Sequence, residues 1–206
     1  MQFSWYGASC FKLIFSETVI STDPFSPAKS GFKNPRINCD AIVFSSLPED
    51  FKKELKKISD ETFVVSTPGE IGIKNVFIYG LPHFEGKDLK IIYKIVAENL
   101  KICFLGEITS QLTTEEIEKM GEVDILILPV SSKIFSDKKV KETINNIEPK
   151  IVIPCCWRKK EDLADLIKEI GSKNIEEVER LKIKKKDLVE NKIKLFILRH
   201  RESSLK

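Results

Sequence analysis

Residue types that carry enzyme chemistry are sparse in this chain of 206 residues. It has two histidines, His83 and His200, and His200 stands among arginines in a tail that we expect to be solvated. A serine and a lysine can act together as nucleophile and base. Ser131-Ser132-Lys133 follows an apolar run, but no neighbouring feature supports that chemistry, so we favour a turn. The sequence has no G-x-S-x-G elbow, no P-loop and no dinucleotide fingerprint, which removes those chemistries as starting points.

The most informative stretch runs from Asn38 to Phe51 and reads N-C-D-A-I-V-F-S-S-L-P-E-D-F. Its apolar run predicts a buried strand that leads into a loop and then a helix. The segment S-L-P-E that begins at Ser46 has the S-x-x-E form of a capping box, in which serine and glutamate side chains bond backbone amides of the first turn. Proline is tolerated there, because its missing N–H would have had no intrahelical partner. We therefore expect Ser46 to cap a helix that begins at Leu47.

The same stretch resembles the metal-binding segment of the metallo-β-lactamase superfamily, in which a strand ends in H-x-H-x-D-H. Other segments are similar, in the same order, to those of the small branch that contains lactonase-like, zinc-dependent hydrolases. Because these segments cover nearly the whole chain, the resemblance is specific. They are W-Y-G-A-S-C-F at 5–11, S-T-D-P-F at 21–25, P-G-E at 68–70, G-L-P-H-F-E at 80–85, F-L-G-E at 104–107, G-E-V-D-I-L-I-L-P-V at 121–130 and P-K-I-V-I-P-C-C-W at 149–157.

The family's first metal position is the more altered of the two. By the resemblance, its ligand slots fall on Ser46, Pro48 and Glu85, or on His83 in place of Glu85 if the register shifts by two residues. A hydrolytic zinc needs imidazole or carboxylate ligands and an open position for water. A neutral serine is a poor zinc ligand and proline has no side-chain donor, so we expect this position to be lost. For His83, a surface or hydrogen-bonded role is favoured over a ligand role.

The second metal position falls, by the same resemblance, on Asp50, Phe51, Glu107 and Cys156. Phe51 has no donor atom and would fill the pocket with an apolar ring. Asp50, Glu107 and Cys156 could still bind a divalent ion, because a thiolate with two carboxylates is a possible ligand set. We favour structural roles: Asp50 in the first turn of its helix, Glu107 in a loop and Cys156 as a small buried group. We therefore expect no bound metal, and zinc or another divalent ion only under the alternative.

Short apolar and β-branched runs between Gly, Pro, Asn and Asp predict the strands, and apolar residues at three- and four-residue spacing predict the helices. The expected strands are Gln2–Tyr6, Phe11–Phe15, Thr18–Thr22, Ala41–Phe44, Thr62–Ser66, Lys74–Tyr79, Ile91–Val96, Lys101–Leu105, Ile125–Leu128, Ile151–Ile153, Lys182–Lys184 and Ile193–Leu198. The expected helices are Glu49–Ile58, Thr114–Lys119, Asp137–Asn145 and Lys160–Ile170. Two packed sheets with helices outside both would bury every apolar face. The resemblance implies the same α/β fold (α+β in some schemes), a four-layer αβ/βα sandwich, and we expect one domain over residues 1–206.

Composition limits the setting of the protein. No apolar run approaches the ~18–20 residues of a membrane span, and the first residues lack the pattern of a signal peptide. Five cysteines without a disulfide framework spacing favour the cytoplasm. The basic run from Arg180 to Lys186 could contact nucleic acid, but it alternates with Leu181 and Ile183 and lacks aromatics, so a solvated strand face is favoured.

The sequence leads to a main hypothesis and an alternative. The main hypothesis is a non-catalytic relative of the metallo-β-lactamase-fold hydrolases, kept as a scaffold or binding protein. The alternative is a metal-dependent hydrolase of a lactone or a phosphorylated sugar ester that uses Asp50, Glu107 and Cys156. Partner, ligand and oligomeric state stay open, a homo-oligomer included.

Overall fold

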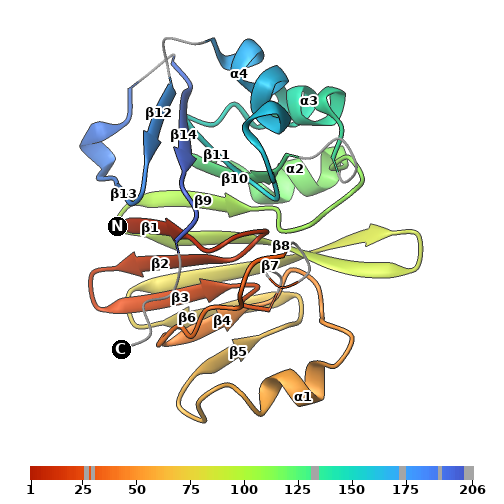
Figure 1. The fold of residues 1–206 in the computed structure, drawn as a ribbon, viewed down its shortest axis with the longest axis vertical. Coiled ribbons are helices and arrows are strands. Elements are labelled where there is room, and N and C mark those ends of the chain that lie inside the picture. The colour runs from red at the N-terminus through yellow and green to blue at the C-terminus, as the bar shows by residue number, and fades with distance from the viewer. Residues whose placement is uncertain (26–27, 29–30, 131–134, 172–174, 190–191, 202–206) are drawn as a thin grey trace.

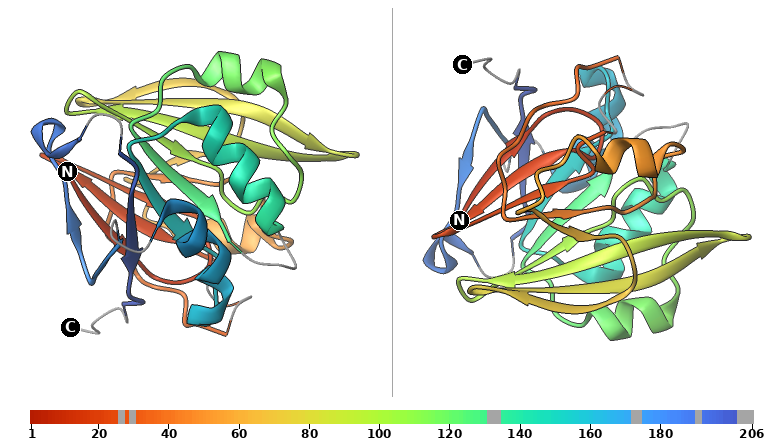
Figure 2. Two further views of the ribbon diagram at one scale, coloured as in Figure 1. Left: turned by 90° about the horizontal axis from the view of Figure 1, so that it is seen from above. Right: turned by 90° about the horizontal axis from the view of Figure 1, so that it is seen from below.

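The fold consists of two β-sheets that lie face to face, with helices beside them (Figures 1 and 2). A computed structural model describes residues 1–25, 28, 31–130, 135–171, 175–189 and 192–201, so the turn expected at 131–133 lies outside the described residues. The six-stranded sheet has the order β13-β1-β2-β3-β4-β5 and the eight-stranded sheet the order β12-β14-β11-β10-β9-β8-β7-β6. The strands are β1 Gln2–Trp5, β2 Phe11–Phe15, β3 Thr18–Thr22, β4 Ala41–Val43, β5 Phe63–Val65, β6 Gly69–Ile73, β7 Val76–Glu85, β8 Asp88–Ala97, β9 Leu100–Phe104, β10 Ile125–Pro129, β11 Ile151–Cys155, β12 Ile175–Val178, β13 Leu181–Lys182 and β14 Lys194–Leu198. The helices are α1 Phe51–Leu55, α2 Thr114–Met120, α3 Asp137–Ile147 and α4 Ala164–Ile170, with short 3-10 turns η2 Lys160–Leu163 and η4 Lys185–Asp187.

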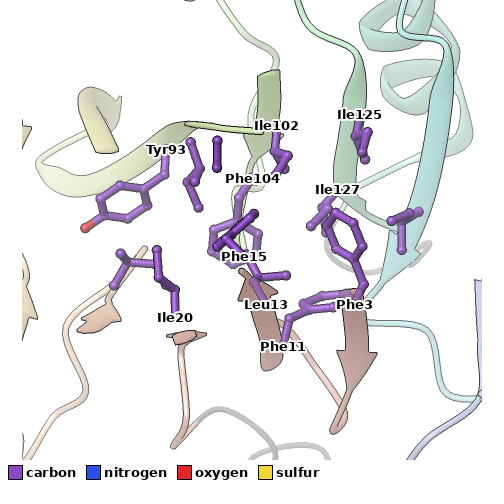
Figure 3. Close-up of a cluster of buried hydrophobic side chains, with 14 of the residues drawn as sticks. Phe3, Phe11, Leu13, Phe15, Ile20, Tyr93, Ile102, Phe104, Ile125 and Ile127 are labelled. Carbon is purple, nitrogen blue, oxygen red and sulfur yellow. The ribbon is translucent and has the colours of Figure 1, made fainter. Parts of the chain in front are cut away.

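Strand β10 explains why the sheets and helices stack as they do. Every residue of β10 is buried. Ile125 and Ile127 face the core between the two sheets, and Leu126 and Leu128 face the core under the helices. A strand buried on both faces is apolar throughout, as this one is. Figure 3 shows the inter-sheet core, where Phe and Leu side chains of β1 and β2 meet Phe104 of β9 and isoleucines of β9 and β10.

The predicted αβ/βα sandwich is confirmed, although its two helical layers are unequal. Helices α2, α3 and α4 pack with the eight-stranded sheet (Figures 1 and 2). Helix α1 lies on the side of the six-stranded sheet, beyond β5 in Figure 1, and none of its residues is buried. It is shorter than the expected helix Glu49–Ile58. Within the described ranges, no helix combines the length and apolar character needed to cross a membrane.

The strand pattern departs from the prediction mainly at sheet edges. Strands β6 and β12 were not expected, because glycines interrupt the first and glutamates dominate the second. Both are outermost strands of the eight-stranded sheet. An edge strand has a neighbouring strand on one side only, so it needs fewer apolar side chains. Strand β7 continues through 80–85, which the sequence analysis placed outside any strand. It forms a long hairpin with β8, closed by pairing of Glu85 with Asp88.

The basic run near the C-terminal strands has the alternation that was predicted, although only Leu181–Lys182 is strand. Leu181 and Ile183 are buried and Lys182 and Lys184 are exposed. The run therefore supplies apolar side chains to the core and lysines to the solvent.

Parallel strands bring several loops to one end of the sandwich. Strand β3 pairs in parallel with β4 in one sheet, and β9, β10 and β11 pair in parallel in the other. Loops that follow parallel strands share one edge of a sheet. The two sheets are tied together there, because the Ile91 N–H donates to the Ser45 carbonyl at 2.8 Å.

Candidate functional site

Polar side chains lie just beyond four strands at this end of the sandwich. Asp23 follows β3, Ser45 follows β4, Glu107 follows β9 and Cys156 follows β11. A small pocket of about 20 Å³ opens among the first three. That volume holds about one water molecule and is far below the ~300 Å³ at which pockets for small molecules begin. The residues that line it are Asp23, Phe25, Phe44, Ser45, Ser46, Pro48 and Glu107.

Asp23 is the most tightly held of these groups. Its carboxylate accepts hydrogen bonds from the Ser45 N–H at 2.7 Å and from the Ser45 hydroxyl at 2.6 Å. Burial, and then the neighbouring Glu107 carboxylate, raise the pKa of Asp23 from 3.8 to about 7, although the Ser45 hydrogen bonds act in the opposite direction. The group is therefore easily protonated, and its main partner is another side chain of this chain.

The loop that carries Glu107 fits against Ser45 only because residue 106 is glycine. Gly106 has a φ of +63°, and a Cβ there would lie 2.1 Å from the Ser45 Oγ. A side chain would therefore push the β9 loop away from the β4 loop. Glu107 is held in turn by the Ser9 hydroxyl, which donates to its Oε1 at 3.0 Å.

Cys156 points toward its neighbour in the sequence. Its Sγ lies 3.7 Å from the Cys155 Sγ, and its N–H donates to the Ala8 carbonyl. The Cys155 thiol, burial and then the nearby carboxylates raise the pKa of Cys156 well above its usual value. This environment favours the protonated thiol.

The capping prediction for Ser46 is wrong. The helix begins at Phe51, four residues later than expected, and the Ser46 hydroxyl accepts a hydrogen bond from the Lys90 ammonium at 2.9 Å. The cause lies in the other sheet: Lys90 engages the hydroxyl, and its neighbour Ile91 holds the preceding residue Ser45. The local S-x-x-E pattern is overridden by contacts from β8.

Pro48, Asp50 and Phe51 provide no ligand cluster either. Asp50 is exposed and precedes α1, but its side chain makes no capping hydrogen bond. The Phe51 ring packs edge-on against Phe44 with ring centroids 5.3 Å apart, and Phe44 lines the pocket. Pro48 contributes an apolar wall to the same pocket.

His83 and Glu85, the two candidates for the third-histidine slot, belong to a different cluster. Glu85 accepts hydrogen bonds from the backbone N–H groups of Thr109 and Ser110. Burial opposes its charged form, but these amides outweigh burial and hold the pKa of Glu85 below its usual value. The main partners of Glu85 are therefore backbone amides of the loop between β9 and α2. His83 lies 3.7 Å from Glu85 and lines no part of the pocket near Asp23.

The donor set does not fit a family-type zinc centre. In the part of the chain that the structure describes, no group of three or more His, Cys, Asp or Glu side chains is placed to hold a metal ion. Asp50, Glu107 and Cys156, the ligand set of the alternative hypothesis, are not brought together. Each of the pocket's donors is instead bonded to a protein partner.

Sequence reasoning missed Asp23 and Ser45 as site residues. The S-T-D-P-F segment was recognised as similar to the family, but its aspartate was given no role. A signal was available, because an aspartate directly after an apolar strand is placed at the strand end where parallel sheets carry their sites.

Comparisons with known proteins agree with this fold. The family model of the β-lactamase superfamily domain matches residues 2–156. A sequence search of curated proteins found no match. A solved structure from Thermotoga maritima, assigned to the Zn-dependent hydrolases of the metallo-β-lactamase superfamily, is 25% identical with a TM-score of 0.79, over 96% of this chain and 99% of that one.

Two further structures share the fold at lower identity. One, assigned as a metal-dependent hydrolase of Parabacteroides distasonis, is 14% identical with a TM-score of 0.63, over 97% of this chain and 93% of that one. The other, a metallo hydrolase of Ignicoccus hospitalis, is 14% identical with a TM-score of 0.55, over 76% of this chain and 82% of that one.

The raised pKa of Asp23 predicts a stability that falls as pH rises. The folded state binds this proton more tightly than the unfolded state, so the stabilisation is full below pH ~4 and is lost as pH rises through about 7. Between about pH 5 and pH 8 we expect the free energy of unfolding to fall by at most ~2.5 kcal/mol on this account. Urea unfolding of the parent and of Asp23→Asn at both pH values measures the effect. An equal decline in Asp23→Asn would contradict the assignment.

The close approach of Gly106 to Ser45 predicts that Gly106→Ala destabilises the protein more than Gly86→Ala. Both glycines have positive φ, +63° and +66°, but a Cβ at Gly86 meets nothing within 4 Å. The shared backbone strain costs ~1–2 kcal/mol, and the clash at Gly106 adds ~1–3 kcal/mol. The difference between the denaturant midpoints of the two variants measures the cost of the clash apart from the shared backbone strain. Equal midpoints would show that the β4 and β9 loops move apart at no cost.

Proposed function

The chain belongs to the metallo-β-lactamase superfamily of hydrolases, and from that premise we propose that it does not hydrolyse substrates at the family's metal position. It acts instead as a binding or scaffold protein. The observation that carries this proposal is the pairing of the site's own donors. Asp23 is hydrogen-bonded to Ser45, Glu107 to Ser9 and the Cys156 thiol to the Cys155 thiol. Each donor therefore has its own protein partner, whereas a metal centre needs donors that converge on one point.

A larger groove that adjoins the small pocket supports a binding role. Its volume is about 800 Å³, within the ~300–1,000 Å³ of small-molecule sites, and it shares Phe25 with the small pocket. Arg36 and Lys57 are the charged residues of the lining, which contains no acidic residue within the described ranges. Glu54 offsets the charge of Lys57, so Arg36 is the main anchor that we assign to an anionic ligand. The lining residues are Ser21, Pro24, Phe25, Asn34, Pro35, Arg36, Ile37, Asn38, Ile42, Lys57, Ile58, Ser59 and Thr62.

The proposal also covers the cellular setting of the protein, nucleic-acid binding and metal cofactors. Five free cysteines support a reducing, cytoplasmic setting. Nucleic-acid binding is disfavoured, since Lys185 of the basic run is paired with Asp124 and Ile183 is buried. No zinc or other metal cofactor is proposed.

Metal content and chelator sensitivity test the loss of hydrolysis. Protein purified without added metal should contain far less than one zinc per chain, because an open zinc site needs three protein ligands. Its hydrolysis of lactones or nitrophenyl esters should be unchanged by a chelator. The Thermotoga maritima relative, carried through the same purification and assay, serves as the control. Close to one zinc per chain together with chelator-sensitive hydrolysis would refute the proposal.

Inorganic phosphate tests the groove. At ten times its Kd, a ligand that binds only the folded state adds ~1.4 kcal/mol of stability, a readily measured rise in Tm. We expect phosphate to raise the Tm of the parent and of Arg158→Ala, an exposed arginine outside the groove, but not of Arg36→Ala. Sodium chloride at the same ionic strength is the control. An equal rise in all three proteins would show that the groove is not the site.

A further inference from the structure

A second cluster of reactive side chains lies outside the pocket and the groove. The loop between β9 and α2 places Ser110 next to His83 of β7, with the Ser110 Oγ 2.8 Å from the His83 Nε2. On the other side of the ring, the His83 Nδ1 lies 2.8 Å from the Oε1 of Glu116, which belongs to α2. Three separate elements thus contribute a hydroxyl, an imidazole and a carboxylate in line.

The order of contacts fixes the roles of the two ring nitrogens. An ionised carboxylate can only accept hydrogen bonds, so Glu116 requires the hydrogen of neutral His83 to be on Nδ1. The Nε2 then carries a lone pair and accepts the hydrogen bond from the Ser110 hydroxyl. This is the relation of nucleophile, base and orienting acid in serine hydrolases, which is recognised by geometry and not by sequence order.

We infer that Ser110 is a nucleophile, with His83 as its base and Glu116 as the group that orients the base, and that it accepts acyl groups from small activated esters. This inference does not rest on the proposed function, because no metal takes part and the residues differ from those of the groove and the pocket.

The surroundings of the cluster favour this role. His83 is buried, at 2% exposure, whereas Ser110 is partly exposed and within reach of a small reagent. Glu116 is fixed by a capping box, since its other oxygen accepts from the Thr113 N–H at 2.7 Å while its own N–H donates to the Thr113 hydroxyl. Glu85, 3.7 Å from the Nε2, adds a second negative charge that stabilises the imidazolium formed when His83 takes the serine proton.

The same surroundings set a limit on the rate. The backbone amides of Thr109 and Ser110 are occupied by Glu85, so neither is available to stabilise an oxyanion. Loss of one oxyanion donor costs ~10²–10³ in rate in a serine hydrolase. We therefore expect reaction with strongly activated acyl compounds and slow turnover.

Besides the ester, the reaction requires only water. The Ser110 Oγ attacks the ester carbonyl as its proton passes to the His83 Nε2. The bond from the carbonyl carbon to the leaving oxygen breaks, and that oxygen takes the proton from Nε2 and departs as an alcohol. Water then attacks the acyl group, gives a proton to Nε2, and releases the acid as Oγ regains that proton.

Labelling with a fluorophosphonate tests the nucleophile. In this reaction the Ser110 Oγ bonds to phosphorus, fluoride leaves and the serine proton passes to His83. Intact mass spectrometry of the full chain should show a single adduct, which peptide mapping places on Ser110. Ser110→Ala should abolish it, and Ser16→Ala, at an exposed serine of the turn between β2 and β3, should leave it unchanged. A chelator should have no effect, so this outcome is independent of the metal test above.

Glu116→Gln separates a catalytic arrangement from a structural one. Glutamine also forms a capping box, so α2 should keep its start. The amide that faces Nδ1 favours the opposite tautomer, in which Nε2 carries the hydrogen and cannot accept the serine proton. We expect labelling to slow by ~10²–10⁴-fold with little change in unfolding midpoint. No adduct on Ser110 in the folded parent, or an equal rate in folded Glu116→Gln, would overturn the inference. If Glu116→Gln does not fold, the Ser110→Ala comparison decides alone, and an adduct that persists there overturns it.

Discussion

Ser45 is the residue on which the functional end of this molecule depends. Its carbonyl accepts from Ile91 of the opposite sheet, while its N–H and hydroxyl donate to Asp23 of its own sheet. The approach is possible because Gly106 has no side chain. A single serine therefore ties together the ends of β3, β4, β8 and β9. The same contacts leave a pocket of about 20 Å³ at these strand ends, where the resemblance places the family's metal position.

Hydrogen bonds from hydroxyl groups stabilise the carboxylates at this end of the sandwich. Two buried or half-buried carboxylates, Asp23 and Glu107, lie close enough to repel each other. A divalent cation would remove that repulsion, but Ser46, Pro48 and Phe51 stand where the resemblance places histidines of the family. The chain instead uses hydroxyl donors, Ser45 for Asp23 and Ser9 for Glu107. Hydroxyls supply partial charge only, so Asp23 keeps a high affinity for a proton. Burial and the repulsion from Glu107 therefore outweigh the hydroxyl donors and keep the pKa of Asp23 raised.

The sequence predicts the fold well where burial dictates it. Strands such as β10, apolar on both faces, and β2, apolar on one face, can be recognised from composition alone, because no other arrangement buries those side chains. Edge strands β6 and β12 escape, since an edge strand needs little apolar surface. At the site, residue type alone argues against a ligand role for Pro48 and Phe51, because neither side chain has a donor atom. The Ser46 cap could not be judged, because its competitor Lys90 lies 44 residues away.

The loop between β9 and α2 connects the pocket near Asp23 with the cluster of Ser110, His83 and Glu116. At its start, Glu107 turns toward Ser9 and the closed pocket; three residues later, Ser110 turns toward His83 on the long hairpin. Glu85, which corresponds by resemblance to a family histidine, binds the amides between them and so fixes the loop. Glu107 and Ser110 thus lie within four residues of chain, and the hydrogen bonds of Glu85 to the loop explain how one side chain turns to each region.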